Sequence, residues 1–199
     1  MSEDQKKQLQ RSLWNIANEL RGKMNADEFR DYMLGFIFYK YLSEKIELYA
    51  NDILQPDNLT YAELLNHPQQ ADYMQAVEKA AIDDIGYFLK PDELFHHVAI
   101  NSATNDNLNE DLERIMNSIE QSTMGHDSED DFEQLFSELD LNATRLGRTV
   151  SQRNELISKV LVHLDKIDFK LADSKVDILG AAYEYLISQF PSGARQNAR

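Results

Sequence analysis

Hydrophobic positions recur at helical spacing along most of this 199-residue chain. Apolar residues three and four positions apart share one face of an α-helix, which has 3.6 residues per turn. Ser2 and Gln5 form a capping-box pattern ahead of the first such stripe, and Gly22 is expected to end the helix. The stripe consists of Leu9, Leu13, Ile16, Ala17 and Leu20. The pattern predicts a fold that is all-α or nearly so.

The next predicted helix follows Asn25, which with Glu28 matches an N-cap pattern. Apolar residues surround it on nearly all sides between Phe29 and Leu42, as in a helix at the centre of a domain. The run is too short to span a membrane, which needs about 20 apolar residues, and Lys40 interrupts it. We predict that this helix forms the core.

Further helices are expected over residues 69–81, from residue 105 or 106 onward, and after Ser151 as N-cap. Residues 85–91 end at a proline, and the residue before a proline avoids the helical region. The compact multi-helix domain therefore contains at most a short strand near residues 85–90. The last helix is expected to bury one stripe, made of Leu179, Ala182, Tyr183, Leu186, Ile187 and Phe190.

This pattern gives one helical domain over residues 1–190. Residues 191–199 are polar, and we expect them to form a tail or a linker toward a catalytic domain that this sequence lacks.

The composition is that of a folded, acidic chain without cysteine, with a net charge of -15 and a pI near 4.6. Because nucleic-acid binding is largely phosphate neutralisation by Lys and Arg, the chain alone should bind DNA weakly or not at all. Its first residues lack the apolar core of a signal peptide. Together with the absence of cysteine, this fits a cytoplasmic location.

Seven acids and no Lys or Arg lie within residues 127–140. This run is compatible with a metal site or with mimicry of DNA phosphates. We favour a helix that packs through Phe132, Leu135, Phe136 and Leu139 and exposes its acids. No catalytic, cofactor or metal residue is predicted, because no two glycines are close enough for a phosphate loop and the histidines are scattered.

The best candidates for DNA contact are Arg145, Arg148 and Arg153, which occupy a loop and the start of the following helix. Helix N-terminal amides favour phosphate there. Arg153 falls in line with the apolar stripe of its helix, which favours a structural role for it. In the last helix, Gly180 and Tyr185 lie off the predicted stripe and are candidates for an interface, because a helix glycine is costly unless another element approaches closely. We favour an approaching element inside this domain over one in the missing remainder of the protein or in a partner subunit.

The chain resembles the N-terminal helical domain of the modification (methylation) subunit of type I restriction–modification enzymes. Four stretches carry the resemblance, in order: Leu13–Gly22, Phe29–Ser43, Leu146–Leu156 and Asp177–Ile187. The resemblance implies an assembly and DNA-clamp domain of an adenine-specific DNA methyltransferase. It further implies S-adenosylmethionine as cofactor of the missing catalytic domain. The implied partners are the specificity subunit, a second modification subunit, the restriction subunit and DNA, with no membrane.

Two other functions stay open at this point. One is an acidic DNA mimic that inhibits nucleic-acid enzymes, although Arg145 and Arg148 directly after the acidic run speak against it. The other is a stand-alone helical protein-interaction module.

Overall fold

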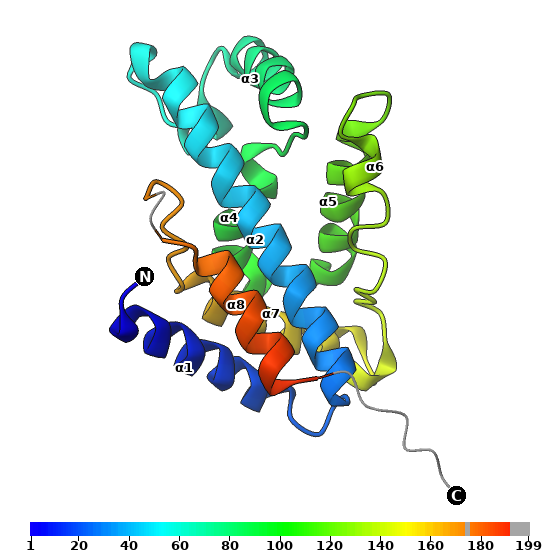
Figure 1. Cartoon of the computed structure of the whole chain (residues 1–199). Coiled ribbons are helices and arrows are strands. Elements are labelled where there is room, and N and C mark those ends of the chain that lie inside the picture. Colours follow the sequence, from blue (N-terminus) through cyan, green and yellow to red (C-terminus); the bar gives the residue numbers. More distant parts are fainter. Residues whose placement is uncertain (174–175, 192–199) are drawn as a thin grey trace, which may run out of the picture.

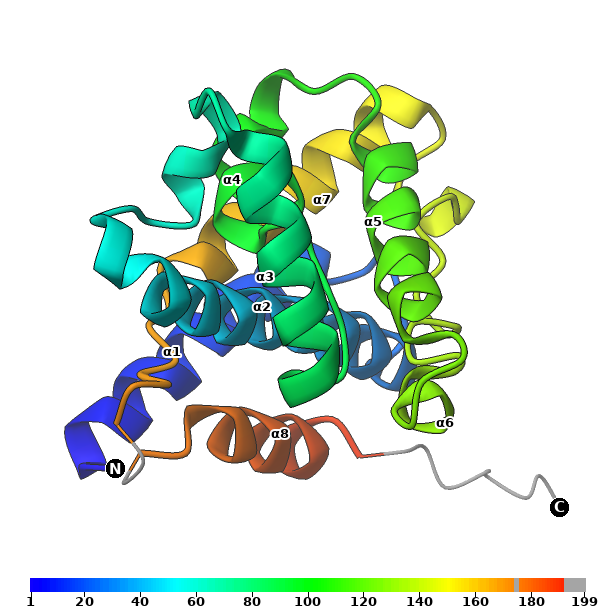
Figure 2. The same ribbon diagram turned by 90° about the horizontal axis from the view of Figure 1, so that it is seen from above.

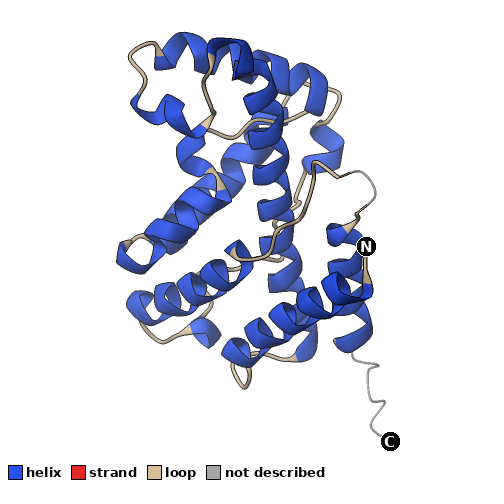
Figure 3. Ribbon diagram, turned by 90° about the vertical axis from the view of Figure 1, so that its left-hand side faces the viewer, coloured by secondary structure: helices blue, strands red, loops and turns tan. Residues whose placement is uncertain are grey.

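The computed structural model describes residues 1–173 and 176–191. Across these ranges every regular element is a helix and no strand occurs, which confirms the all-α prediction (Figure 3). The α-helices are α1 (Glu3–Leu20), α2 (Ala26–Leu54), α3 (Gln70–Ile85), α4 (Phe95–Asn101), α5 (Leu108–Thr123), α6 (Glu129–Phe132), α7 (Val150–Asp165) and α8 (Ile178–Gln189). Short 3-10 helices lie at Gln55–Asp57, Ala62–Asn66, Pro91–Glu93, Ser102–Thr104 and Thr144–Leu146. No helix among these residues is long and apolar enough to cross a membrane.

Helix α2 runs through the middle of the molecule, and α3, α4, α7 and α8 pack against it (Figure 1). Its 29 residues extend for roughly 44 Å. Phe36 and Ile37 are among its buried side chains, as predicted for a central helix. Lys40 is also buried, and its ammonium pairs with Glu44 and lies 5.0 Å from the ring of Phe169. The charge that interrupts the apolar run is therefore neutralised within the core.

The first two helices begin where their sequence patterns place them. Ser2 accepts a hydrogen bond from the backbone N–H of Gln5, and the Gln5 side chain accepts one from the backbone of Ser2. Asn25 and Glu28 form the same reciprocal pair at the start of α2. Between the helices, Gly22 adopts φ +78°, a left-handed conformation that glycine favours.

Residues 87–90 form neither a helix nor a strand, and Lys90 at their end is extended. Side chains hold this connector in place: the Tyr87 hydroxyl donates to the carbonyl of Leu42 at 2.5 Å, and the Ser122 hydroxyl accepts from the Phe88 N–H at 3.0 Å. Its backbone is fixed by neighbouring helices rather than by a second strand.

The prediction of a helix over residues 127–140 is wrong. Only Glu129–Phe132 is helical, turns follow, and Gln134 adopts φ 58°. Like charges four residues apart, as in Asp127 with Asp131, destabilise a helix. The apolar positions were nevertheless identified correctly, because Phe136 and Leu139 are buried and Phe132 and Leu135 pack partly buried against the core.

The predicted stripe of α8 is also wrong in part. Ile178, Ala182 and Leu186 are buried, whereas Tyr183 and Ile187 are 49% and 39% exposed. Helix α8 packs against both α1 and α2, as Figures 1 and 2 show from two directions. Because the helix is apolar on most sides, its sequence pattern did not identify the sector that faces this pair.

Candidate nucleic-acid interface

The three candidate arginines lie around the N-terminus of α7, where the preceding loop is fixed to the first helical turn. Thr149 is the N-cap: its hydroxyl accepts from the Gln152 N–H at 3.2 Å. The Gln152 side chain in turn accepts from the N–H groups of Arg148 and Thr149 at 3.0 and 3.3 Å. The predicted cap, Ser151, is therefore wrong by two residues. The reason is that Thr149, not Ser151, has a Gln at the third helical position to complete a capping box.

Gly147 allows the loop to lie directly against this turn. A Cβ at Gly147 would lie 2.7 Å from Cβ of Gln152 and 2.8 Å from the backbone nitrogen of Arg153. These distances are below van der Waals contact, so the close approach requires glycine here.

Arg145 is engaged by α2. Its guanidinium pairs with Glu28, which also completes the N-terminal cap of α2, and it lies 5.9 Å from the ring centroid of Tyr32. The hydrogen bond with Tyr32 raises the pKa of Arg145 further, and burial raises the pKa of Tyr32. Arg145 therefore ties the loop to α2.

Arg153 folds back on the same loop. Its Nη1 donates to the carbonyl of Gly147 at 2.9 Å, and its Nε is buried without a hydrogen-bond partner among the described residues. A guanidinium in this position holds the loop onto α7.

Arg148 differs from both. Like Arg145 it is exposed, but its side chain has no hydrogen bond or ion pair within the described part of the chain, and it lines a surface hollow with Lys23 and Lys159. Its backbone is fixed by Gln152. Arg145 and Arg153 are thus held by partners within the domain, whereas the guanidinium of Arg148 is available to a ligand. Contact with DNA remains a prediction for all three.

The two interface candidates on α8 have partners inside the domain. A Cβ at Gly180 would lie 2.2 Å from Oδ2 of Asp177, whose carboxylate caps α8 by accepting from the Gly180 N–H at 2.7 Å. Tyr185 packs partly buried against the core, and burial raises its pKa. The N-cap accounts for the close approach at Gly180, and an interface role for either residue remains a prediction.

Sequence patterns alone missed the exposed apolar residues beside α8. Trp14 on α1 is 43% exposed and stacks on Phe190, with ring centroids 6.4 Å apart. Tyr183 and Ile187 are exposed on α8 itself. The position of Trp14 off the α1 stripe was the available signal in the sequence.

Throughout the described residues no group of three or more His, Cys, Asp or Glu side chains is arranged to hold a metal ion. His96 instead pairs with Asp165 at 2.9 Å.

The comparisons with known proteins agree with each other. The HsdM N-terminal domain family matches residues 9–164. The methylase subunit of the type I restriction enzyme MpnII from Mycoplasma pneumoniae is 32% identical, over 96% of this chain and 36% of that protein. The crystal structure of a type I restriction–modification methyltransferase subunit from Streptococcus thermophilus superposes with a TM-score of 0.75 at 30% identity, over 93% of this chain and 39% of that one. The chain thus spans between a third and two fifths of the length of these relatives. It belongs to the HsdM N-terminal domain family of type I restriction–modification methyltransferase subunits.

Proposed function

We propose that this domain is the assembly and DNA-clamp part of the methylation subunit of a type I restriction–modification enzyme. The observation that supports it most is the match of residues 9–164 to the HsdM N-terminal domain family. The exposed guanidinium of Arg148 on a rigid loop supports the DNA part. The exposed apolar side chains of Trp14, Tyr183 and Ile187 support the assembly part.

The chemistry belongs to the rest of the proposed subunit. That part would bind S-adenosylmethionine and transfer its methyl group to adenine in DNA, in the cytoplasm. The partners proposed for the assembly are the specificity subunit, a second methylation subunit, the restriction subunit and DNA. The domain itself contributes positioning and no catalytic group.

The test is Arg148→Ala in the complete enzyme, with Lys79→Ala as control. Lys79 is an exposed lysine on α3, outside the arginine loop. DNA affinity is measured over a series of salt concentrations, and assembly with the specificity subunit by gel filtration. We expect the Arg148 variant to assemble normally and to lose about one unit from the slope of log K against log salt. The Lys79 variant should keep the slope.

If the Arg148 variant keeps the full salt slope, Arg148 does not contact DNA phosphates. A complete, unmodified subunit that fails to join a specificity subunit contradicts the assembly function itself.

A further inference from the structure

The charge of this chain is divided sharply along the sequence. Residues 24–144 contain 26 acids and only six Lys or Arg, a net charge of -20. Residues 1–23 contain three acids and five Lys or Arg, and residues 145–170 contain three acids and six Lys or Arg. These two basic segments are far apart in sequence, and they include α1 and α7.

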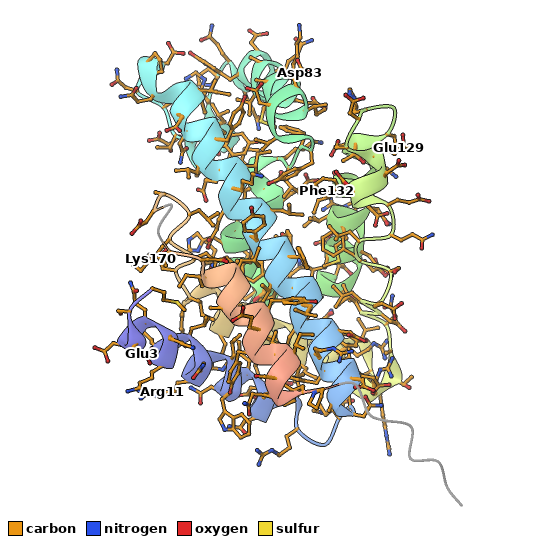
Figure 4. All side chains as sticks on the ribbon, in the orientation of Figure 1. Glu3, Arg11, Asp83, Glu129, Phe132 and Lys170 are labelled. Carbon is orange, nitrogen blue, oxygen red and sulfur yellow. The ribbon has the colours of Figure 1, made fainter. Side chains whose placement is uncertain are left out.

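The fold brings the two basic segments together. Helices α1 and α7 pack against each other, with the C-terminal end of α1 beside the N-terminal end of α7. Arg11, Lys170 and the acid Glu3 lie on the side of the molecule that carries α1, whereas Asp83 on α3 and Glu129 on α6 lie at the far end (Figure 4). The two segments together carry eleven Lys or Arg and six acids, so they have a net positive charge in an acidic protein.

Two surface hollows lie beside α1, and cations line both: one lies between α1 and α7, and the other between α1, residues 166–170 that follow α7, and Ile178 of α8. The first contains Lys23, Arg148 and Lys159 together with Glu19 and Glu155. The second, at the other end of the seam, contains Lys166 and Lys170 together with Asp168 and polar residues of α1. We call this row of five cations the α1/α7 seam.

Most of the charge of the seam is available to a ligand. Within the described part of the chain, the side chains of Lys23, Arg148 and Lys166 have no ion pair. Lys159 pairs with Glu155 at 3.5 Å and Lys170 pairs with Asp168 at 3.3 Å, but exposed ion pairs of this kind contribute about 0–1 kcal/mol. A phosphate can displace a carboxylate held this weakly.

We propose that the α1/α7 seam is the track on which the phosphate backbone of a DNA duplex lies. The proposal rests on the proposed function and names its contact surface. Helix α7 has 16 residues and is about 24 Å long. Duplex DNA carries one negative charge per roughly 1.7 Å of its axis, so a line of cations of this length faces several phosphates. The acidic remainder of the domain repels DNA and orients it toward the seam.

A linear row of cations favours a linear polyanion over an acidic protein, whose charges are scattered. Because the seam includes α1, it also extends the candidate interface well beyond the arginine loop. Sequence patterns did not reveal it, since residues 1–23 and 145–170 become neighbours only in the fold.

The experiment uses the complete methylation complex with the double variant Lys23→Glu and Lys166→Glu. The control is Lys79→Glu with Lys90→Glu, which changes the net charge equally on exposed residues outside the seam. Binding of a fluorescent duplex is measured by anisotropy at several salt concentrations. Unfolding midpoints and gel filtration verify that both variants fold and assemble.

We expect the seam variant to bind DNA at least tenfold more weakly at low salt and to show a shallower salt slope, whereas the control changes affinity less than threefold. Equal losses in the two variants would mean that net charge alone matters, and they overturn the seam. Full DNA binding combined with lost assembly assigns the seam to a protein partner instead. Neither outcome contradicts the proposed function, which would fail only if the unmodified complex did not assemble or did not bind DNA.

Discussion

At the scale of single residues, Gly147 determines where the arginine loop lies. Its φ of 165° is ordinary extended backbone, so the requirement for glycine is steric and not conformational. We predict that Gly147→Ala lowers the free energy of unfolding by about 1–3 kcal/mol, because the new methyl group overlaps the backbone of Arg153. Urea unfolding measures the change.

The matched control is the neighbouring Arg148→Ala. This side chain is exposed and has no hydrogen bond or ion pair among the described residues, so its removal should change stability by less than about 0.5 kcal/mol. Equal midpoints for the two variants would mean that the loop moves away from α7 at no cost.

Glu47 shows how burial couples stability to pH. Burial raises the pKa of this carboxyl above its ordinary value of 4.5, although the charges of His96 and Lys40 oppose the shift. The folded state therefore binds more protons than the unfolded state in this range. The contribution of Glu47 is fully present below about pH 4.5 and is lost as the pH rises through the raised value.

Glu47→Gln should therefore gain stability over the unmodified protein at pH 7 and lose that gain at pH 4. The exposed Glu78→Gln on α3 controls for the removal of any negative charge from an acidic chain. The measurement is the urea midpoint of each variant at pH 7 and pH 4. If both variants gain the same stability at pH 7, the gain does not come from the burial of Glu47.

At the scale of elements, α2 contributes to the core through its contacts with α3, α4, α7 and α8. The side chain of Phe36 on α2 is only 2% exposed. We predict that Phe36→Ala costs about 3–5 kcal/mol, from lost burial and the cavity left behind. On the same helix Leu48 is 38% exposed, and Leu48→Ala should cost less than about 1 kcal/mol. Denaturant unfolding measures the loss of stability in each variant. Similar losses for Phe36→Ala and Leu48→Ala would mean that α2 is not a core helix.

The helices that the sequence pattern located best are those with a reciprocal cap and one clear apolar stripe. Ser2 and Asn25 are the N-caps of α1 and α2, as predicted, because the capping interactions are local. The helix prediction for residues 127–140 failed because the apolar residues have helical spacing but the acids, at the same spacing, repel one another. Leu139 packs onto the core through tertiary contacts, and the helical spacing of apolar residues cannot predict such contacts.

The candidate site was predictable only at the level of residue type. The pattern of arginines located the loop, but it did not distinguish Arg148 from Arg145. That difference depends on Glu28 and Tyr32, which are more than 100 positions away in sequence. Tyr183 and Ile187 were assigned to the wrong face for a similar reason, since the position of α8 between α1 and α2 decides which sector is buried.

At the scale of the whole molecule, the spacing of the glycines bears on cofactor binding. No two of its seven glycines are close enough in sequence to form a phosphate-cradling turn. We predict that titration of this chain with S-adenosylmethionine gives no saturable heat in calorimetry. A complete methylation subunit is the positive control, and a measurable affinity of the isolated domain would falsify the division of labour between the two parts.

The segregated charge also makes the stability of the whole domain dependent on salt. Two like charges 10 Å apart repel by about 0.4 kcal/mol in water, and residues 24–144 carry a net charge of -20. Raising NaCl from about 0.01 M to about 0.1 M shortens the Debye length from roughly 30 Å to 10 Å and screens this repulsion. The urea midpoint should therefore rise with salt.

A matched variant locates the effect. Asp127→Asn with Asp131→Asn removes two neighbouring charges from the exposed acidic segment. This variant should be more stable than the unmodified chain at 0.01 M salt and should gain less from added salt, since part of the repulsion is already gone. A midpoint that falls with salt would instead mean that ion pairs such as Arg145–Glu28 outweigh the repulsion. In that case the acidic side would be held together by its few cations, and its acids would be less available to repel DNA toward the α1/α7 seam.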